Sequence, residues 1–103
     1  MPITRIGEFQ AKPETTETLR DFLLSIMPRI KSSRGCESVT LYQSIPDPIQ
    51  FTMLEVWDSL ESHQASVKNI PPEMLTGIRP LLASAPSAGY YELRNTLGKQ
   101  QGD

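Results

Sequence analysis

The sequence has few of the residues from which metal sites and disulfides are built. Its 103 residues include a single cysteine, Cys36, and a single histidine, His63. One cysteine cannot form an internal disulfide, and one cysteine with one histidine cannot supply the ligand set of a structural zinc site. Gly35 and Gly77 are isolated, whereas phosphate-binding loops need several glycines at fixed spacing. We therefore predict neither a metal nor another cofactor.

Long apolar runs and an excess of one charge are also missing. No apolar stretch approaches the roughly 20 residues of a membrane helix, and the N-terminus, Met-Pro-Ile-Thr-Arg-Ile, lacks the apolar core of a signal peptide. Ten basic and 12 acidic side chains give a net charge of −2, which creates no attraction to nucleic acid or an anionic membrane. We expect a cytoplasmic protein with neither of these partners.

The residues that are present indicate one α+β domain. Residues 3–11, 36–44 and 51–57 are rich in the apolar and β-branched side chains of strands, and residues 90–95 read as a last short strand. The turn at residues 45–48, with two prolines and an aspartate, predicts a hairpin between the second and third strands.

Two helical regions separate these strands. The first has an amphipathic stripe whose members are Leu19, Phe22, Leu23, Ile26, Met27 and Ile30. Pro28 falls inside this stripe and predicts a kink or a break in the helical hydrogen bonds. The second region opens at Asp58 or Ser59, is broken by two prolines at 71–72 and resumes over residues 73–82. We predict one domain over residues 1–95 and a flexible tail over residues 96–103.

The order strand, helix, strand, strand, helix, strand is the split βαβ arrangement of ferredoxin-like folds, with a four-stranded antiparallel sheet. Helices would cover one face of this sheet. Depending on the register, the other face carries large side chains drawn from Tyr42, Phe51, Met53, Trp57 and Tyr90. Such a face is too apolar to remain in water, so we expect a second copy to cover it in a twofold homodimer.

The stretch from Phe51 to His63 holds the only tryptophan and the only histidine. Alternation along the strand places Phe51, Met53, Glu55 and Trp57 on one face. A helix start follows directly, so the strand end and the first helical turns lie next to each other. We expect one wall of a functional site here.

Four short segments resemble the antibiotic biosynthesis monooxygenase family. They are residues 9–14 after the first strand, 34–36 before the second, 55–59 at the end of the third and 91–93 in the last. The resemblance covers nearly the whole chain and implies a dimeric ferredoxin-like α/β barrel. It also implies one of three activities: oxygenation of anthrones or quinols without metal or flavin, degradation of haem, or isomerisation of small signalling or catabolic metabolites or another reaction on them. Many members have a histidine where this chain has Ser66, and the histidine here comes earlier, at His63.

Cofactor-free oxygenation needs a dry apolar pocket and a base for an electron-rich phenol. The candidate catalytic residues are His63 and Glu55, and the candidate substrate-binding residues are Trp57, Tyr42, Phe51, Met53, Tyr90 and Arg79. Each has a structural alternative. The aromatic and methionine side chains fill a core or an interface, His63 and Arg79 lie on the surface, and Glu55 pairs with Arg5 or Arg94 because a buried unpaired carboxylate is costly.

Three functions follow from this sequence. The first is a cofactor-independent monooxygenase that acts with O2 on a small aromatic or quinol-like substrate. The second is a haem-binding or haem-degrading protein, in which His63 would be the ligand. The third is a dimeric, non-catalytic module that binds an apolar metabolite.

Overall fold

In a computed structural model, which describes residues 1–98, four strands form one antiparallel sheet. The strands are β1 (Ile3–Gln10), β2 (Cys36–Gln43), β3 (Gln50–Trp57) and β4 (Ser87–Tyr91). Their order across the sheet is β2-β3-β1-β4, so β2 and β4 are the edges. β2 and β3 are antiparallel neighbours, and the predicted hairpin and ferredoxin-like fold are therefore confirmed.

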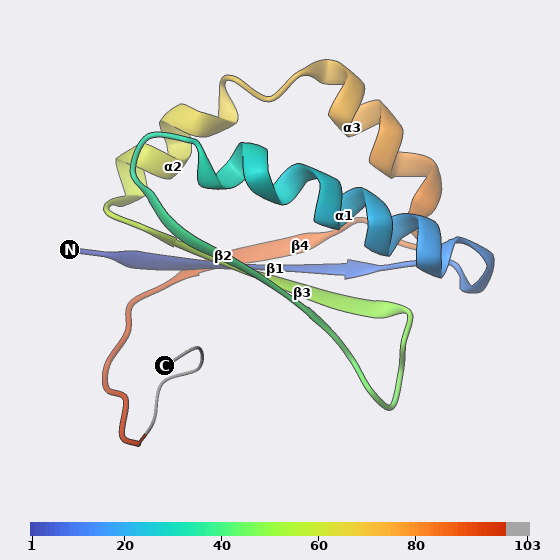
Figure 1. Ribbon diagram of the computed structural model, residues 1–103, viewed down its shortest axis with the longest axis horizontal. Coiled ribbons are helices and arrows are strands. Elements are labelled where there is room, and N and C mark those ends of the chain that lie inside the picture. The colour runs from blue at the N-terminus through green and yellow to red at the C-terminus, as the bar shows by residue number, and fades with distance from the viewer. Residues whose placement is uncertain (99–103) are drawn as a thin grey trace.

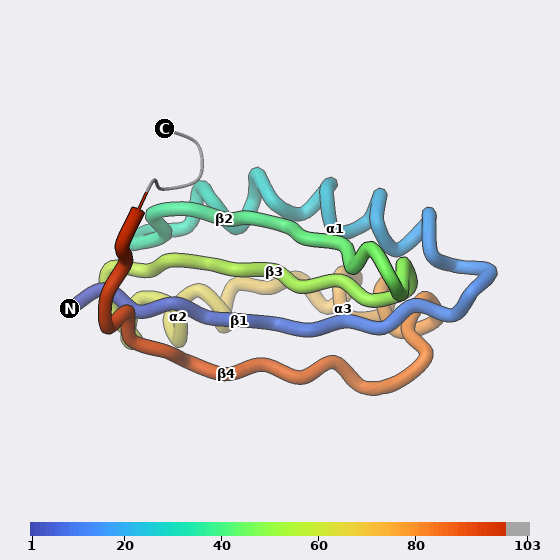
Figure 2. Tube along the Cα trace, turned by 90° about the horizontal axis from the view of Figure 1, so that it is seen from below, coloured from blue at the N-terminus to red at the C-terminus, as the bar shows by residue number. Residues whose placement is uncertain are grey.

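The helices follow the predicted order. They are η1 (Pro13–Thr15), α1 (Thr16–Lys31), α2 (Leu60–Val67), α3 (Pro72–Ile78) and η2 (Arg79–Leu81). The helices α1, α2 and α3 lie on one side of the sheet (Figure 1), and α1 runs along β2 (Figure 2). α1 continues past Pro28 to Lys31, so the proline does not end the helix. No helix among the described residues is long and apolar enough to cross a membrane.

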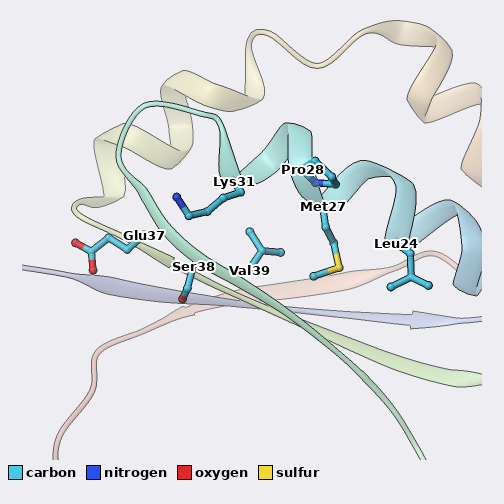
Figure 3. A pocket seen from close by; sticks show the side chains of 7 residues that line it. All are labelled: Leu24, Met27, Pro28, Lys31, Glu37, Ser38 and Val39. Carbon is cyan, nitrogen blue, oxygen red and sulfur yellow. The ribbon is translucent and has the colours of Figure 1, made fainter. Parts of the chain in front are cut away.

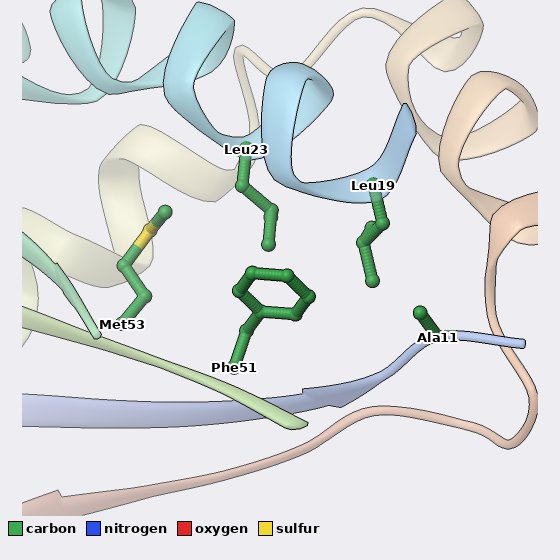
Figure 4. Close-up of a cluster of buried hydrophobic side chains, with 5 residues drawn as sticks. All are labelled: Ala11, Leu19, Leu23, Phe51 and Met53. Atoms are coloured by element: carbon green, nitrogen blue, oxygen red, sulfur yellow. The ribbon is translucent and has the colours of Figure 1, made fainter. Parts of the chain in front are cut away.

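The hydrophobic core lies between α1 and the sheet. Leu19 and Leu23 point down from α1 onto Phe51 of β3, with Met53 and Ala11 at the sides of the ring (Figure 4). Phe51 is 1% exposed, and both leucines are fully buried. Burying a side chain of this size stabilises the fold by about 1.5–3 kcal/mol. This cluster holds α1 in place over one end of the sheet.

The prediction of which large side chains lie on the open face of the sheet was mostly wrong. Phe51, Met53 and Trp57 all lie on the helix-covered face of β3, and Tyr90 shares that face because it pairs with Arg5 of β1. Of the five predicted residues, only Tyr42, opposite Thr52, lies on the open face. The helices cover the face with the larger side chains because this buries more apolar surface.

The open face is still apolar along the middle of the sheet. Ile6 of β1 pairs with Leu54 of β3, and Val56 follows on the same face of β3. Tyr91 of β4 lies opposite Thr4 on this face and is 54% exposed. No other segment of residues 1–98 packs over these side chains as a helix or a strand.

The last strand lies earlier in the chain than predicted, at Ser87–Tyr91 instead of residues 90–95. β1 sets this register, because Thr4 to Glu8 pair with Tyr91 to Ser87. After β4 the chain leaves the sheet on the side away from the helices and crosses the ends of β1 and β3 (Figures 1 and 2). Of the predicted tail, residues 96–98 form no helix or strand, and residues 99–103 lie outside the described part of the chain.

Candidate functional site

His63 is held against the sheet by the first turns of α2. Ser59 is the N-cap of this helix, and its Oγ accepts a hydrogen bond from the backbone N–H of Ser62 at 3.1 Å. The helix starts directly after β3, so its second turn lies above the end of that strand. His63 therefore faces the sheet and is only 6% exposed.

Below α2 lies the buried carboxylate of Glu55. The indole Nε1 of Trp57 donates to Glu55 Oε1 at 3.0 Å, and Nη1 of Arg5 lies 3.5 Å from Glu55 Oε2. Glu55 is 5% exposed and Trp57 is 1% exposed. Of the two ion-pair partners predicted for Glu55, the structure shows Arg5, whereas Arg94 pairs with Glu92. A charge this deeply buried is tolerated because both of its oxygens have partners.

His63 connects this carboxylate to Tyr90 on the edge strand β4. Its Nδ1 is 2.6 Å from the Tyr90 hydroxyl, and its Nε2 is 4.0 Å from Glu55 Oε1. The imidazole also makes edge contacts with two aromatic rings, Trp57 at 5.2 Å and Tyr90 at 5.3 Å between ring centroids. We call Arg5, Glu55, Trp57, His63 and Tyr90 the polar cluster.

The electrostatics of the polar cluster keep His63 neutral. Burial, together with the positive charge of Arg5, lowers the pKa of His63 from 6.5 to about 4. Near pH 7 the imidazole is therefore uncharged, and the 4.0 Å approach to Glu55 is not an ion pair. The neutral imidazole has a lone pair that can accept a proton next to the hydroxyl, and its lowered pKa makes it a weaker base than an ordinary histidine.

Cys36 lies near this region but does not have the chemistry of a nucleophile. It is buried, and it pairs with Trp57 at the end of β3. Burial, and secondarily the charge of Glu55, raises the pKa of its thiol above 9.0. A thiol with a raised pKa carries little thiolate near neutrality and reacts slowly.

The remaining candidate residues lie elsewhere. Phe51 and Met53 belong to the core under α1, and Tyr42 is on the open face. Arg79 is exposed in η2. In the same helix, the carbonyl of Leu81 accepts a hydrogen bond from Thr15, which follows β1 in the chain, so η2 lies at the other end of the sheet from His63. Of the candidates, the structure therefore brings together His63, Glu55, Trp57 and Tyr90, and it adds Arg5. Sequence reasoning treated Arg5 only as a partner for Glu55, because the cross-strand register could not be fixed.

A hollow on the surface of residues 1–98 does not contain the polar cluster. It has a volume of about 420 Å³ and lies between α1 and the edge strand β2, where Met27 and Val39 face each other (Figure 3). Lys31 and Glu37 lie at one end of it. It contains no group suited to proton transfer near neutral pH, so chemistry is better argued from the polar cluster.

The residues of the polar cluster do not fit a haem ligand or a metal site. An axial histidine needs one ring nitrogen free toward the iron, but Nδ1 of His63 faces the Tyr90 hydroxyl and Nε2 faces Glu55. Among residues 1–98, no three histidine, cysteine, aspartate or glutamate side chains are grouped as metal ligands would be.

Comparison with known proteins identifies the family. The family model for antibiotic biosynthesis monooxygenase matches residues 2–76. The chain belongs to the antibiotic biosynthesis monooxygenase family. The match includes β1, α1, β2, β3 and α2, and therefore every residue of the polar cluster except Tyr90. No curated protein matches the sequence.

Solved structures of other proteins have the same fold as this chain, although their sequences are only distantly similar to it. Rv0793 from Mycobacterium tuberculosis is 18% identical with a TM-score of 0.80, and the match covers 95% of this chain and all of that one. A conserved protein from Methanosarcina mazei is 21% identical at a TM-score of 0.80, covering 91% and 94% of the two chains. PA3566 from Pseudomonas aeruginosa is 24% identical at a TM-score of 0.76, covering 90% and 95%. These likenesses bear on the fold alone.

Proposed function

We propose that this protein is a cofactor-independent monooxygenase that acts on a small phenol or quinol, with His63 as the proton acceptor. The observation that carries this proposal is a neutral imidazole, 6% exposed, held between a hydroxyl and a buried carboxylate. Membership of a family named for monooxygenase activity supports the reaction class.

The proposed reaction requires that the substrate lose its phenolic proton and then react with O2. Loss of the phenolic proton makes the aromatic ring electron-rich enough to reduce O2. One oxygen atom then enters the product and the other leaves as water, while the substrate supplies the electrons by losing two hydrogens. Trp57 and the edge contacts between rings keep water away from the imidazole, and Glu55 lies 4.0 Å from its Nε2.

Oxygen uptake by metal-free protein with 1,4-dihydroxynaphthalene tests this proposal. Conversion to the hydroxynaphthoquinone should incorporate one atom from labelled O2, whereas spontaneous oxidation gives the unsubstituted quinone and peroxide. His63→Gln should lower the catalysed rate by about 100-fold or more. The exposed neighbour change Gln64→Ala is the matched control and should keep the rate. Labelled product no faster than without protein would reject the oxygenase, and tight binding without turnover would favour a non-catalytic binding module.

We also propose that the working form is a homodimer in the cytoplasm. Helices cover one face of the sheet, while no helix or strand of residues 1–98 covers Ile6, Leu54 and Val56 on the other face. A second copy offers the same apolar face, so that a twofold axis would bury both together. This pairing would shield the sheet without changing the polar cluster on its opposite side.

A further inference from the structure

The accessible end of the polar cluster is Tyr90 and not His63. Tyr90 is 45% exposed, whereas His63 and Glu55 are 6% and 5% exposed. The Tyr90 hydroxyl lies 2.6 Å from Nδ1 of His63. The other ring nitrogen faces Glu55. Tyr90 is therefore the more accessible side chain of this hydrogen-bonded pair.

The surroundings of His63 determine which ring nitrogen carries its hydrogen. The charged or titratable groups that face the ring are Glu55 from β3, Arg5 from β1 and Tyr90 from β4. An ionised carboxylate only accepts hydrogen bonds, so the tautomer with hydrogen on Nε2, toward Glu55, is favoured. Nδ1 then has the lone pair, and the Tyr90 O–H donates to it. The Tyr90 oxygen keeps its own lone pairs to accept from a ligand.

We propose that Tyr90 is the catalytic residue that touches the substrate and that it relays the substrate's proton to His63. The inference rests on the proposed oxygenase function and identifies its substrate-binding end. A phenolic O–H of the substrate donates to Tyr90 Oη. When that O–H bond breaks, the substrate's hydrogen forms a new bond to the Tyr90 oxygen. At the same time, the hydrogen that Tyr90 carried moves to Nδ1 of His63. The result is a substrate phenolate, a neutral Tyr90 and an imidazolium facing Glu55, with one proton transferred and no electrons.

The same geometry indicates which substrates suit the relay. Tyrosine is itself a phenol, so the proton exchange between substrate and Tyr90 takes place between groups of the same chemical type. Leu60 and Val67 lie about one turn either side of His63 on α2 and are 37% and 46% exposed. They are exposed apolar side chains on the helix that carries His63. The relay therefore requires an aromatic substrate with a free hydroxyl, and a methyl ether of the same ring should fail.

The tautomer can be measured because the chain has a single histidine. In protein labelled with ¹⁵N-histidine, the ring nitrogen shifts should show hydrogen on Nε2 and an unprotonated Nδ1 at pH 7. Hydrogen on Nδ1 would make Tyr90 the acceptor and would overturn the relay. In Tyr90→Phe, loss of the donor to Nδ1 should raise the pKa of His63, because a hydrogen bond to the neutral form has been removed.

The contact with substrate is tested with 1,4-dihydroxynaphthalene under anaerobic conditions. It should shift the His63 ring nitrogens in the wild-type protein, whereas 1,4-dimethoxynaphthalene should not. Tyr90→Phe should abolish the shift, and Tyr91→Phe, on the opposite face of β4, should preserve it. No shift in the wild-type protein, or a shift that survives in Tyr90→Phe, would overturn the inference.

Turnover separates this inference from the proposed function. If both hold, Tyr90→Phe lowers kcat by about 100-fold or more, as His63→Gln does, and Tyr91→Phe leaves it unchanged. If Tyr90→Phe keeps kcat while His63→Gln loses it, the protein is an oxygenase but the substrate contacts His63 directly. If the wild-type protein does not turn over, the oxygenase fails, while the tautomer and the anaerobic shifts still decide the contact with Tyr90.

Discussion

At the scale of single residues, the polar cluster is stable because its members satisfy one another. Glu55 accepts from Trp57 and pairs with Arg5, and His63 pairs with Tyr90. Among residues 1–98, no buried side-chain nitrogen or oxygen lacks a hydrogen-bond partner. Burial of the polar cluster has one main consequence: the pKa of His63 is lowered, so His63 becomes charged only at a lower pH than usual.

This property predicts how stability depends on pH. The pKa of His63 is about 4 in the folded chain and 6.5 in the unfolded chain, so the unfolded chain binds a proton more readily between these values. The stability contribution is fully present above pH 6.5 and is lost as the pH falls toward 4. The difference corresponds to about 3 kcal/mol.

Urea unfolding between pH 7.5 and pH 4 measures this effect. The wild-type protein should lose about 3 kcal/mol more over this interval than His63→Gln, which keeps a polar side chain but does not titrate. Equal losses in the two proteins would mean that His63 does not carry the dependence.

At the scale of the elements, one glycine joins the loop before β2 to the start of α2. Gly35 has φ +90°, and its carbonyl accepts from the backbone N–H of Asp58 at 2.8 Å. A Cβ added there would lie 2.5 Å from Ser62 Oγ and 2.7 Å from Asp58 Oδ1. The backbone conformation and the lack of space both require glycine at this position, which in turn positions the helix that carries His63.

Gly35→Ala should therefore lower the free energy of unfolding by about 2 kcal/mol or more. Gly98→Ala is the matched control, because Gly98 has a similar φ of +92° but no atom within 4 Å of the added Cβ. Thermal or urea unfolding of both variants gives the comparison. A Gly35→Ala protein as stable as the Gly98→Ala protein would contradict the assigned role.

At the scale of the whole molecule, the sheet separates two kinds of surface. The helix-covered face holds the core and the polar cluster, while the open face presents Ile6, Leu54 and Val56. The proposed homodimer uses only the open face. A change there should alter assembly without changing the environment of His63.

Leu54→Lys should raise the dissociation constant of the proposed dimer by about tenfold or more, because it places a charge at the centre of an apolar contact. Leu75→Lys, on α3 and already 55% exposed, should leave assembly unchanged. Sedimentation velocity at micromolar concentration measures both. A wild-type protein that sediments only as a folded monomer would reject the homodimer.

The sequence by itself determined the order of the elements and the fold, because the apolar periods of α1 and β3 and the turn before β3 are local signals. It also indicated that the end of β3 and the start of α2 hold a site, since Trp57 and His63 are close in the chain. Only the tertiary structure decided which face of the sheet the helices cover. That choice placed Phe51 and Met53 in the core and brought Arg5 and Tyr90 to Glu55 and His63. Cross-strand register depends on contacts between residues far apart in the chain, and a shift of one residue reverses every face.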